Sequence, residues 1–114
     1  MKRRTILWNY PTKIQLSKIP KLYSTENIPL NDKKIYMHFF IGGSDWYISE
    51  FDGEDTMFGY TILNGDTEMA EWGYISLSEL KRVKQGFMQV DRDRHWKVKK
   101  VKDIPEIFRC GEYT

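Results

Sequence analysis

Runs of apolar residues in the middle of the chain predict a meander of antiparallel strands. Four runs rich in β-branched, aromatic or Met residues occur there, and turn sequences containing Gly, Asn or Asp separate them. The turns are Gly42-Gly43, residues 52–55 and residues 64–66. The predicted strands cover residues 34–41, 45–51, 57–63 and 71–75.

Strict alternation along these strands predicts which side chains share a face of the sheet. In the second strand it places Trp46, Ile48 and Glu50 on one face. Tyr47, Ser49 and Phe51 fall on the other. In the third strand, Phe58, Tyr60 and Ile62 share one side.

Helices and short strands are predicted on both sides of this meander. A short helix is expected between Thr12 and Ile19, ending before Pro20, and residues 21–30 are expected to be coil. Ser76-Leu77-Ser78-Glu79 has the pattern of a capping box and predicts a helix that Gly86 ends.

The C-terminal third predicts further strands and a last helical turn. Strands are expected at Phe87-Met88 and from Arg94 to Lys99, the latter with Trp96 and Val98 facing inward. Asp103-Ile104-Pro105-Glu106 is typical of a helix start, and Ile104, Ile107 and Phe108 are expected to pack down from it. These elements predict an α+β fold, a bent antiparallel sheet of about five to six strands with one or two short helices.

The 114 residues correspond to one domain. We expect an irregular leader over residues 1–12 and a single domain over residues 13–114. Cys110 is the only cysteine, so no disulfide forms within the chain, and it has no local nucleophile signature. No apolar stretch approaches the ~18 residues of a membrane span, and we expect a cytoplasmic protein without a membrane partner.

The charges are segregated along the sequence. Residues 35–80 contain nine acidic residues and no Lys or Arg, whereas the flanks carry all 18 Lys and Arg, and the formal net charge is +2. Such a distribution bears on association and on the choice of partner rather than on the fold. A charged surface that binds a partner, or ion pairing within the same monomer, would both account for it.

The densest acidic group is a candidate partner-binding face. Clustered carboxylates could hold a cation or imitate nucleic acid, but their spacing does not match a calcium loop, and a solvated hairpin tip is the simpler interpretation. The members of this group are Glu50, Asp52, Glu54 and Asp55.

The basic stretch near the C-terminus is a candidate nucleic-acid face. Cations bind backbone phosphates and exposed aromatic rings stack on bases. An ordinary charged outer face of a strand is the alternative. The candidate residues are Arg92, Arg94, Lys97, Lys99, Lys100 and Lys102.

A small pocket is the second candidate site. His38 lies in an apolar run and could face a cavity with Trp46 and Tyr60, with Glu50 nearby, or it could be a hydrogen-bonded histidine of the sheet. The two His and the single Cys do not have zinc-ligand spacing, so no metal, cofactor or catalytic residue is predicted.

Several segments of the chain resemble the family called domain of unknown function 2958. The residues that carry the resemblance are Ile19-Pro20-Lys21-Leu22-Tyr23-Ser24-Thr25-Glu26, Ile28-Pro29-Leu30, Phe39-Phe40, Trp46-Tyr47-Ile48-Ser49-Glu50-Phe51-Asp52, Trp72-Gly73-Tyr74-Ile75-Ser76-Leu77-Ser78-Glu79-Leu80 and Asp91-Arg92-Asp93. Trp72 and Ile75 depart conservatively from the family pattern, and the resemblance covers roughly residues 14–108.

The resemblance implies a small bacterial protein associated with plasmids, phages and integrative elements, with no assigned catalytic residue. Glu26, Glu50 and Asp52 are polar positions shared with the family pattern. We therefore expect a non-enzymatic binding or accessory protein whose partner is a nucleic acid or a nucleic-acid-handling protein. A small enzyme or ligand-binding domain is the alternative, and the oligomeric state is left open.

Overall fold

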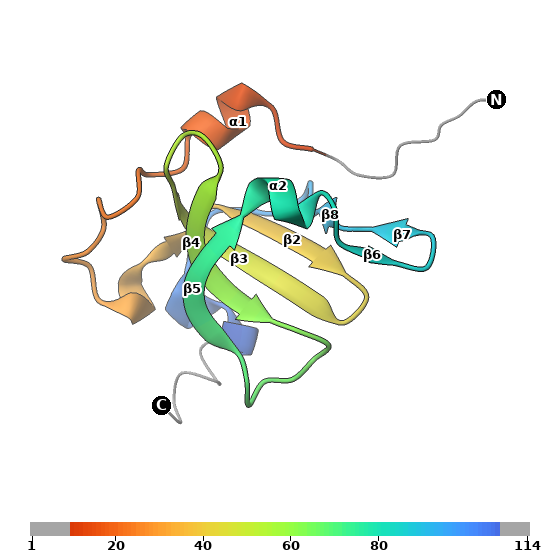
Figure 1. Cartoon of the computed structure of the whole chain (residues 1–114). Helices are drawn as coiled ribbons and strands as arrows, with labels where there is room; N and C mark the ends of the chain where they lie inside the picture. Colours follow the sequence, from red (N-terminus) through yellow and green to blue (C-terminus); the bar gives the residue numbers. More distant parts are fainter. Residues whose placement is uncertain (1–9, 108–114) are drawn as a thin grey trace.

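A five-stranded antiparallel sheet forms the centre of the structure, a computed structural model that describes residues 10–107 (Figure 1). The strand order is β5-β4-β3-β2-β8, so three hairpin connections join β2 through β5 in sequence. The strands are β2 (Met37–Ile41), β3 (Ser44–Phe51), β4 (Thr56–Ile62), β5 (Glu71–Ser76) and β8 (Asp91–Arg92). The predicted meander and the α+β class are confirmed.

Both faces of the sheet are covered. One face carries the larger core, which includes Phe39, Trp46 and Ile48 and packs against helices α1 (Lys13–Ser17) and α2 (Leu77–Leu80). The other face carries Tyr47, Tyr60 and Ile62 under the C-terminal segment. Burying a large apolar side chain contributes ~1.5–3 kcal/mol, so these two layers hold the sheet in place.

A β-bulge in β3 overturns the predicted faces of this strand. Ile48 pairs with Gly59 and Glu50 pairs with Phe58, so Ser49 is the extra residue. The insertion reverses the alternation, and Phe51 joins the core of Trp46 and Ile48 while Glu50 turns to the opposite face. The predictions that Glu50 shares a face with Trp46 and Ile48, and Phe51 a face with Tyr47, were therefore wrong.

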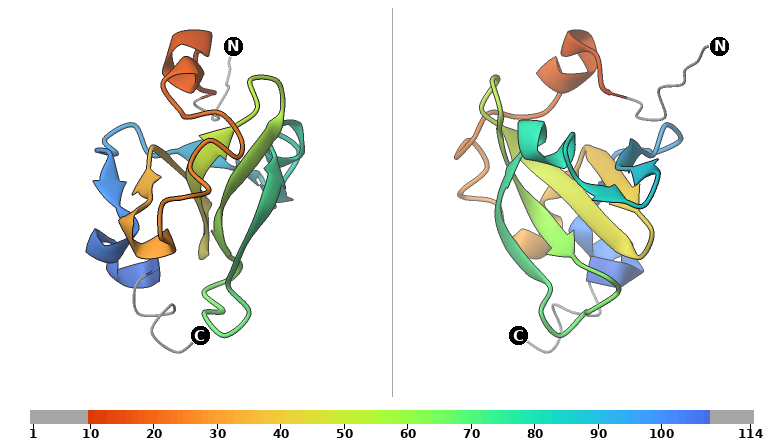
Figure 2. Two further views of the ribbon diagram at one scale, coloured as in Figure 1. Left: turned by 90° about the vertical axis from the view of Figure 1, so that its left-hand side faces the viewer. Right: turned by 45° about the vertical axis from the view of Figure 1, so that its right-hand side comes forward.

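The first predicted strand is broken at Tyr36. Residues Lys34–Ile35 form β1, which pairs with β9 (Lys99–Lys100) instead of with the central sheet. Figure 2 shows β1 and β9 side by side, away from β4 and β5. The segment between α1 and β1 includes the 3-10 helix η1 (Leu30–Asp32) and is bonded to Glu50, on the face of the sheet that carries Tyr47 and Tyr60.

The predicted helix up to Gly86 was too long. α2 ends at Leu80, and Lys84–Gln85 (β6) and Met88–Gln89 (β7) form a hairpin instead. Gly86 is the first central residue of its turn and has a φ of 61°, which a turn with a left-handed first position requires. The hairpin projects from the body (Figure 1), and Phe87 at its tip is 99% exposed.

The C-terminal segment also differs from the prediction. The predicted strand at residues 94–99 is reduced to β9, and Val98 is exposed, although Trp96 does pack inward as expected. The 3-10 helix η2 (Val101–Asp103) and a helical turn at residues 105–107 follow. Ile104 and Ile107 are buried as predicted, whereas Phe108 lies outside the described residues.

Candidate functional site

A buried carboxylate attaches the 20–28 segment to the sheet. The bulge directs Glu50 to the face that carries Tyr47 and Tyr60, where it is only 4% exposed. Its oxygens accept hydrogen bonds from the amides of Tyr23 (2.8 Å) and Thr25 (3.1 Å) and from the Thr25 hydroxyl. Charge-assisted bonds of this kind are stronger than neutral ones, so Glu50 fixes the course of the segment.

Lys33 completes this buried group. Its Nζ donates to the Thr25 carbonyl (2.5 Å) and hydroxyl (2.7 Å) and lies 3.8 Å from Glu50 Oε2. The side chains of both charged residues are less than a tenth exposed. A buried charge is tolerated only when it is paired and hydrogen-bonded, and both conditions are met here.

Tyr23 has an unusual backbone conformation at this point. Its φ is 70°, in the left-handed region that bulky residues rarely adopt. The bond from its amide to Glu50 stabilises this conformation, and Tyr23 as a whole is 57% exposed. Strained backbone that the surroundings hold in place is concentrated at functional sites.

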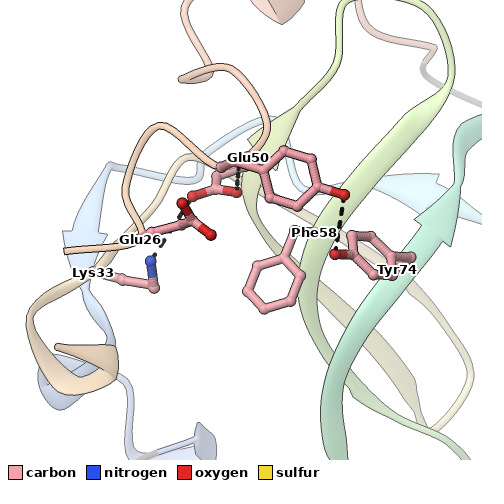
Figure 3. A pocket seen from close by; sticks show the side chains of 6 residues that line it. Glu26, Lys33, Glu50, Phe58 and Tyr74 are labelled. Atoms are coloured by element: carbon pink, nitrogen blue, oxygen red, sulfur yellow. Dashed lines mark hydrogen bonds and ion pairs between the residues drawn. The ribbon is translucent and has the colours of Figure 1, made fainter. Parts of the chain in front are cut away.

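The segment and the sheet enclose a pocket of about 290 Å³. Figure 3 shows its side chains converging from the 20–28 segment, from Lys33 just before β1, and from β3, β4 and β5. The hydroxyl of Tyr74, on β5, donates to that of Tyr23 (3.3 Å), and Phe58 lies between Tyr74 and Trp72. The lining residues are Tyr23, Glu26, Lys33, Glu50, Phe58 and Tyr74.

The Tyr74 hydroxyl is the titratable group of the rim with a shifted pKa. Its hydrogen bond to Tyr23 raises the pKa above the ordinary value, and a slight loss of solvation and the charges of Glu50 and Glu26 act in the same direction. Tyr74 therefore stays protonated and uncharged at neutral pH.

The acidic residues grouped by the sequence do not form one surface. Asp52 Oδ1 accepts from the amides of Glu54, Asp55 and Thr56 and so closes the β3–β4 turn. Asp55 accepts from the Ser76 hydroxyl and the Ser78 amide at the start of α2. Glu54 is exposed, whereas Glu50 is buried on the face of Tyr47 and Tyr60. The structure thus separates Glu50 from the other three.

The predicted pocket of His38, Trp46 and Tyr60 is not a single site. His38 pairs with Tyr47 and Trp46 pairs with Phe39, so His38 and Trp46 lie on opposite faces. Tyr60 shares the face of His38 but lines a different cavity, beside Trp72 and Val101.

His38 is held between two carboxylates. Its Nε2 lies 2.8 Å from Asp45 Oδ1 and its Nδ1 lies 3.4 Å from Asp93 Oδ2, while the ring stacks on Tyr47 at 4.6 Å. A cavity of about 510 Å³ opens beside it, with Arg92, Arg94 and three Asp residues in its lining. Its charges of both signs favour no single class of ligand.

The six candidate basic residues are not gathered at one place. Arg92 and Arg94 line the cavity beside His38. Lys99 and Lys100 form β9, where Lys100 lies directly opposite Lys34 and the Lys99 ammonium lies 4.5 Å from the Trp96 ring. Lys97 is exposed, and Lys102 is within 3.6 Å of Asp32.

Most of the pocket residues were not predicted as a site. Glu26 was singled out through the family resemblance, and Glu50 through the acidic group and the His38 pocket as well, but Tyr23, Lys33, Phe58 and Tyr74 were not named as site residues. One signal was available, because strict alternation placed the Glu50 carboxylate in an apolar core, which a charge avoids. That conflict pointed to a bulge.

Metal and membrane criteria add no further site. Within residues 10–107, no group of three His, Cys, Asp or Glu side chains is arranged to hold a metal ion. No helix in the same range is long and apolar enough to cross a membrane. Cys110 lies outside the described residues.

Comparisons with known proteins give one family. No curated protein and no solved structure matches the chain. The sequence profile of a protein family, described as "Protein of unknown function (DUF2958)", matches residues 23–102 and so spans the pocket and the whole central sheet. The chain therefore belongs to the DUF2958 family.

Proposed function

We propose that this protein is a non-enzymatic binding protein whose pocket receives a cationic side chain of a partner protein. The observation that carries the proposal is Tyr23, which is held at a φ of 70° by Glu50 and presents its ring at the pocket rim. A site prepared in this way does not have to order its rim when it binds, and the cost of association falls.

The chemistry of the lining favours a cation. Two carboxylates and one ammonium line the pocket, which gives a net charge of −1. Tyr23, Phe58 and Tyr74 supply aromatic rings, and a Lys or Arg side chain interacts favourably with such rings by ~0.5–2 kcal/mol. Glu26 is exposed and is the carboxylate available to pair with the cation.

The hydrogen bonds of the buried pair support binding rather than catalysis. Glu50 already accepts from two amides and a hydroxyl, and Lys33 already donates to Thr25. A general base or a nucleophile needs an accessible atom within reach of a substrate, and these groups are used in holding the segment.

The expected partner is a protein with a basic surface. Proteins that handle nucleic acids carry clustered Lys and Arg, and such a surface would complement this pocket. The association of the family with plasmids, phages and integrative elements, which the resemblance implies, makes an accessory protein of a mobile element the setting that we propose.

Titration with acetyl-arginine-amide, followed by amide NMR shifts, tests the proposal. We expect shifts centred on Tyr23 and Tyr74, and a loss of binding of about tenfold in Glu26→Gln, because the variant removes the free carboxylate. Glu54→Gln, an exposed acid elsewhere, is the matched control and should bind like the parent. Equal binding by both variants, or shifts outside the pocket, would contradict the proposal.

A second candidate function, polyanion binding, is favoured by the pairing of β1 with β9. Lys34 and Lys100 lie directly opposite each other, and like charges in this position are destabilising. A nucleic-acid phosphate would relieve this repulsion, with Lys97 and Lys99 nearby in the sequence. The log of the affinity for single-stranded DNA should fall linearly with log salt, and Lys97→Ala with Lys99→Ala should reduce the slope. Binding that does not depend on salt would rule this function out.

A further inference from the structure

The outer edge of β5 is an open hydrogen-bonding edge. In the strand order of residues 10–107, β5 has a single neighbour, β4. The strand is six residues long, and after Glu71 it carries no charged residue and no proline. Native proteins usually protect long edges with charges, proline or bulges, because an open edge pairs with other chains.

The register shows which backbone groups face outward. Leu77 N donates to Asp55 O across the end of the β4–β5 ladder, so this pair belongs to the hydrogen-bonded set. Such pairs alternate along an antiparallel ladder. Continuing the register places Ile75 and Gly73 in hydrogen-bonded pairs with β4, and Trp72 and Tyr74 in the non-hydrogen-bonded pairs. The N–H and C=O groups of Trp72 and Tyr74 therefore point away from β4.

These outward groups coincide with the pocket rim. Within residues 10–107, no other backbone or side-chain group is bonded to them. The rings of Trp72 and Tyr74 lie on the face that carries Phe58 and the pocket. The backbone groups of Trp72 and Tyr74 can therefore form hydrogen bonds with an added strand, and their rings can contact the side chains of that strand.

We propose that β5 binds an extended, arginine-containing segment of the partner protein as an added strand. This inference rests on the proposed function and specifies the partner as an extended peptide. Main-chain hydrogen bonds to Trp72 and Tyr74 supply affinity, as in other cases of strand addition. Residues opposite them place their side chains on the pocket face about 4.8 Å from β5, where an arginine can stack on the Tyr74 ring.

Charge complementarity selects this occupant over a second copy of the chain. The pocket has a net charge of −1, and Glu71 begins the edge strand. Pairing of β5 with another β5 would bring two such acidic surfaces together, whereas a basic peptide neutralises them.

Amide hydrogen exchange with a defined peptide tests the inference. The probe is a capped hexapeptide of alternating valine and arginine, and its control is the same peptide N-methylated at every backbone amide, which keeps the charge but has no N–H left to donate to β5. We expect the Trp72 and Tyr74 amides to be protected only by the first peptide, with affinity at least tenfold above the control. Equal affinity of the two peptides without protection would overturn the inference.

Two variants distinguish the contribution of the β5 backbone to peptide binding from that of the Tyr74 ring. Tyr74→Ala removes the aromatic ring and keeps the outward N–H, whereas Tyr74→Pro removes both, and proline is tolerated where an edge amide faces solvent. We expect the hexapeptide to bind several times more weakly to the proline variant than to the alanine variant, with circular dichroism confirming the fold of each. Equal affinities would count against the edge. If the proline variant does not fold, the N-methylated peptide alone decides.

The outcomes distinguish this inference from the proposed function. Acetyl-arginine-amide cannot add a strand. If it binds but the hexapeptide protects neither amide, the pocket binds cations and strand addition at β5 is ruled out. If the hexapeptide protects the amides but acetyl-arginine-amide does not bind, β5 accepts a strand and the proposed cation site in the pocket is ruled out. A concentration-dependent dimer with the same two amides protected would show that a second copy occupies the edge and would overturn the choice of partner.

Discussion

Glu50 and Asp52 are two residues apart in the sequence but belong to regions of opposite character. Glu50 is buried and joins two segments of the chain that are more than 20 residues apart. Asp52 is exposed and accepts only from amides of its own turn. The bulge at Ser49 sets the orientation of Glu50 and brings it into the pocket, whose lining does not include Asp52. A dense acidic stretch is therefore no guide to a common surface, and the following variants test that difference.

The largest effect is expected from Glu50→Gln. The neutral amide leaves Lys33 buried without its counter-charge, and removing one partner of a buried ion pair costs ~3–5 kcal/mol. Urea unfolding should show this loss in the free energy of unfolding, whereas Glu54→Gln should stay within ~0.5 kcal/mol of the parent.

Adding Lys33→Met to Glu50→Gln sharpens this first prediction. The double variant has no unpaired charge, so it should recover much of the stability lost by the single change. If the single variant were as stable as Glu54→Gln, the buried pair would have no part in holding the segment.

Gly59→Ala should have the next largest effect, because it acts at the bulge itself. A Cβ at Gly59 would lie 2.1 Å from the Tyr47 carbonyl oxygen, so the backbone of β3 or β4 has to move, at a cost of ~2–3 kcal/mol. Gly73, its partner on β5, has no atom within 4 Å of such a Cβ, and Gly73→Ala is the matched control. Thermal melting should separate the two variants by several degrees. Coincident melting curves would show that the close approach is not a constraint.

The sequence was sufficient for features that depend on local patterning. The Gly42-Gly43 turn, the strands β3 to β5 and the inward packing of Trp96 follow from alternation and turn chemistry, which act over a few residues. The strand predicted over residues 34–41 was broken because Lys34 and Ile35 pair with β9, more than 60 residues away. No local pattern contains that partner.

The pocket could not be predicted for the same reason. It depends on one inserted residue in β3 and on a φ of 70° at Tyr23, which has no sequence signature comparable to glycine. Gly86 did signal a positive φ, but the same signal fits a helix end and a hairpin turn. β6 pairs with β7, so Gly86 lies in a hairpin turn and not at a helix end.

The smallest effect on stability is expected from changes at Asp52 and Asp55, in the turn that follows β3. Amides of the turn, that of Glu54 foremost, lower the pKa of Asp52 below its ordinary value of 3.8, and the Ser76 hydroxyl and the Ser78 amide lower that of Asp55. A carboxyl with a lower pKa in the folded state stabilises the fold above its unfolded pKa, and this contribution disappears as the pH falls through the folded value. The two residues thus contribute at neutral pH and not in strong acid.

Asp52→Asn combined with Asp55→Asn should therefore cost about 1 kcal/mol at pH 7, since it weakens a turn and a helix cap at a solvated site. Urea midpoints measured from pH 7 to about pH 2 should converge for the variant and the parent as the carboxylates of the parent become protonated. Glu54→Gln at the same turn should follow the parent throughout. A gap between variant and parent that persisted in acid would mean that the two residues act through packing rather than through charge. The effect of Asp52 and Asp55 would then not come from charge at all, and the comparison with Glu50, whose effect comes from a buried charge, would no longer be one between a buried and an exposed charge.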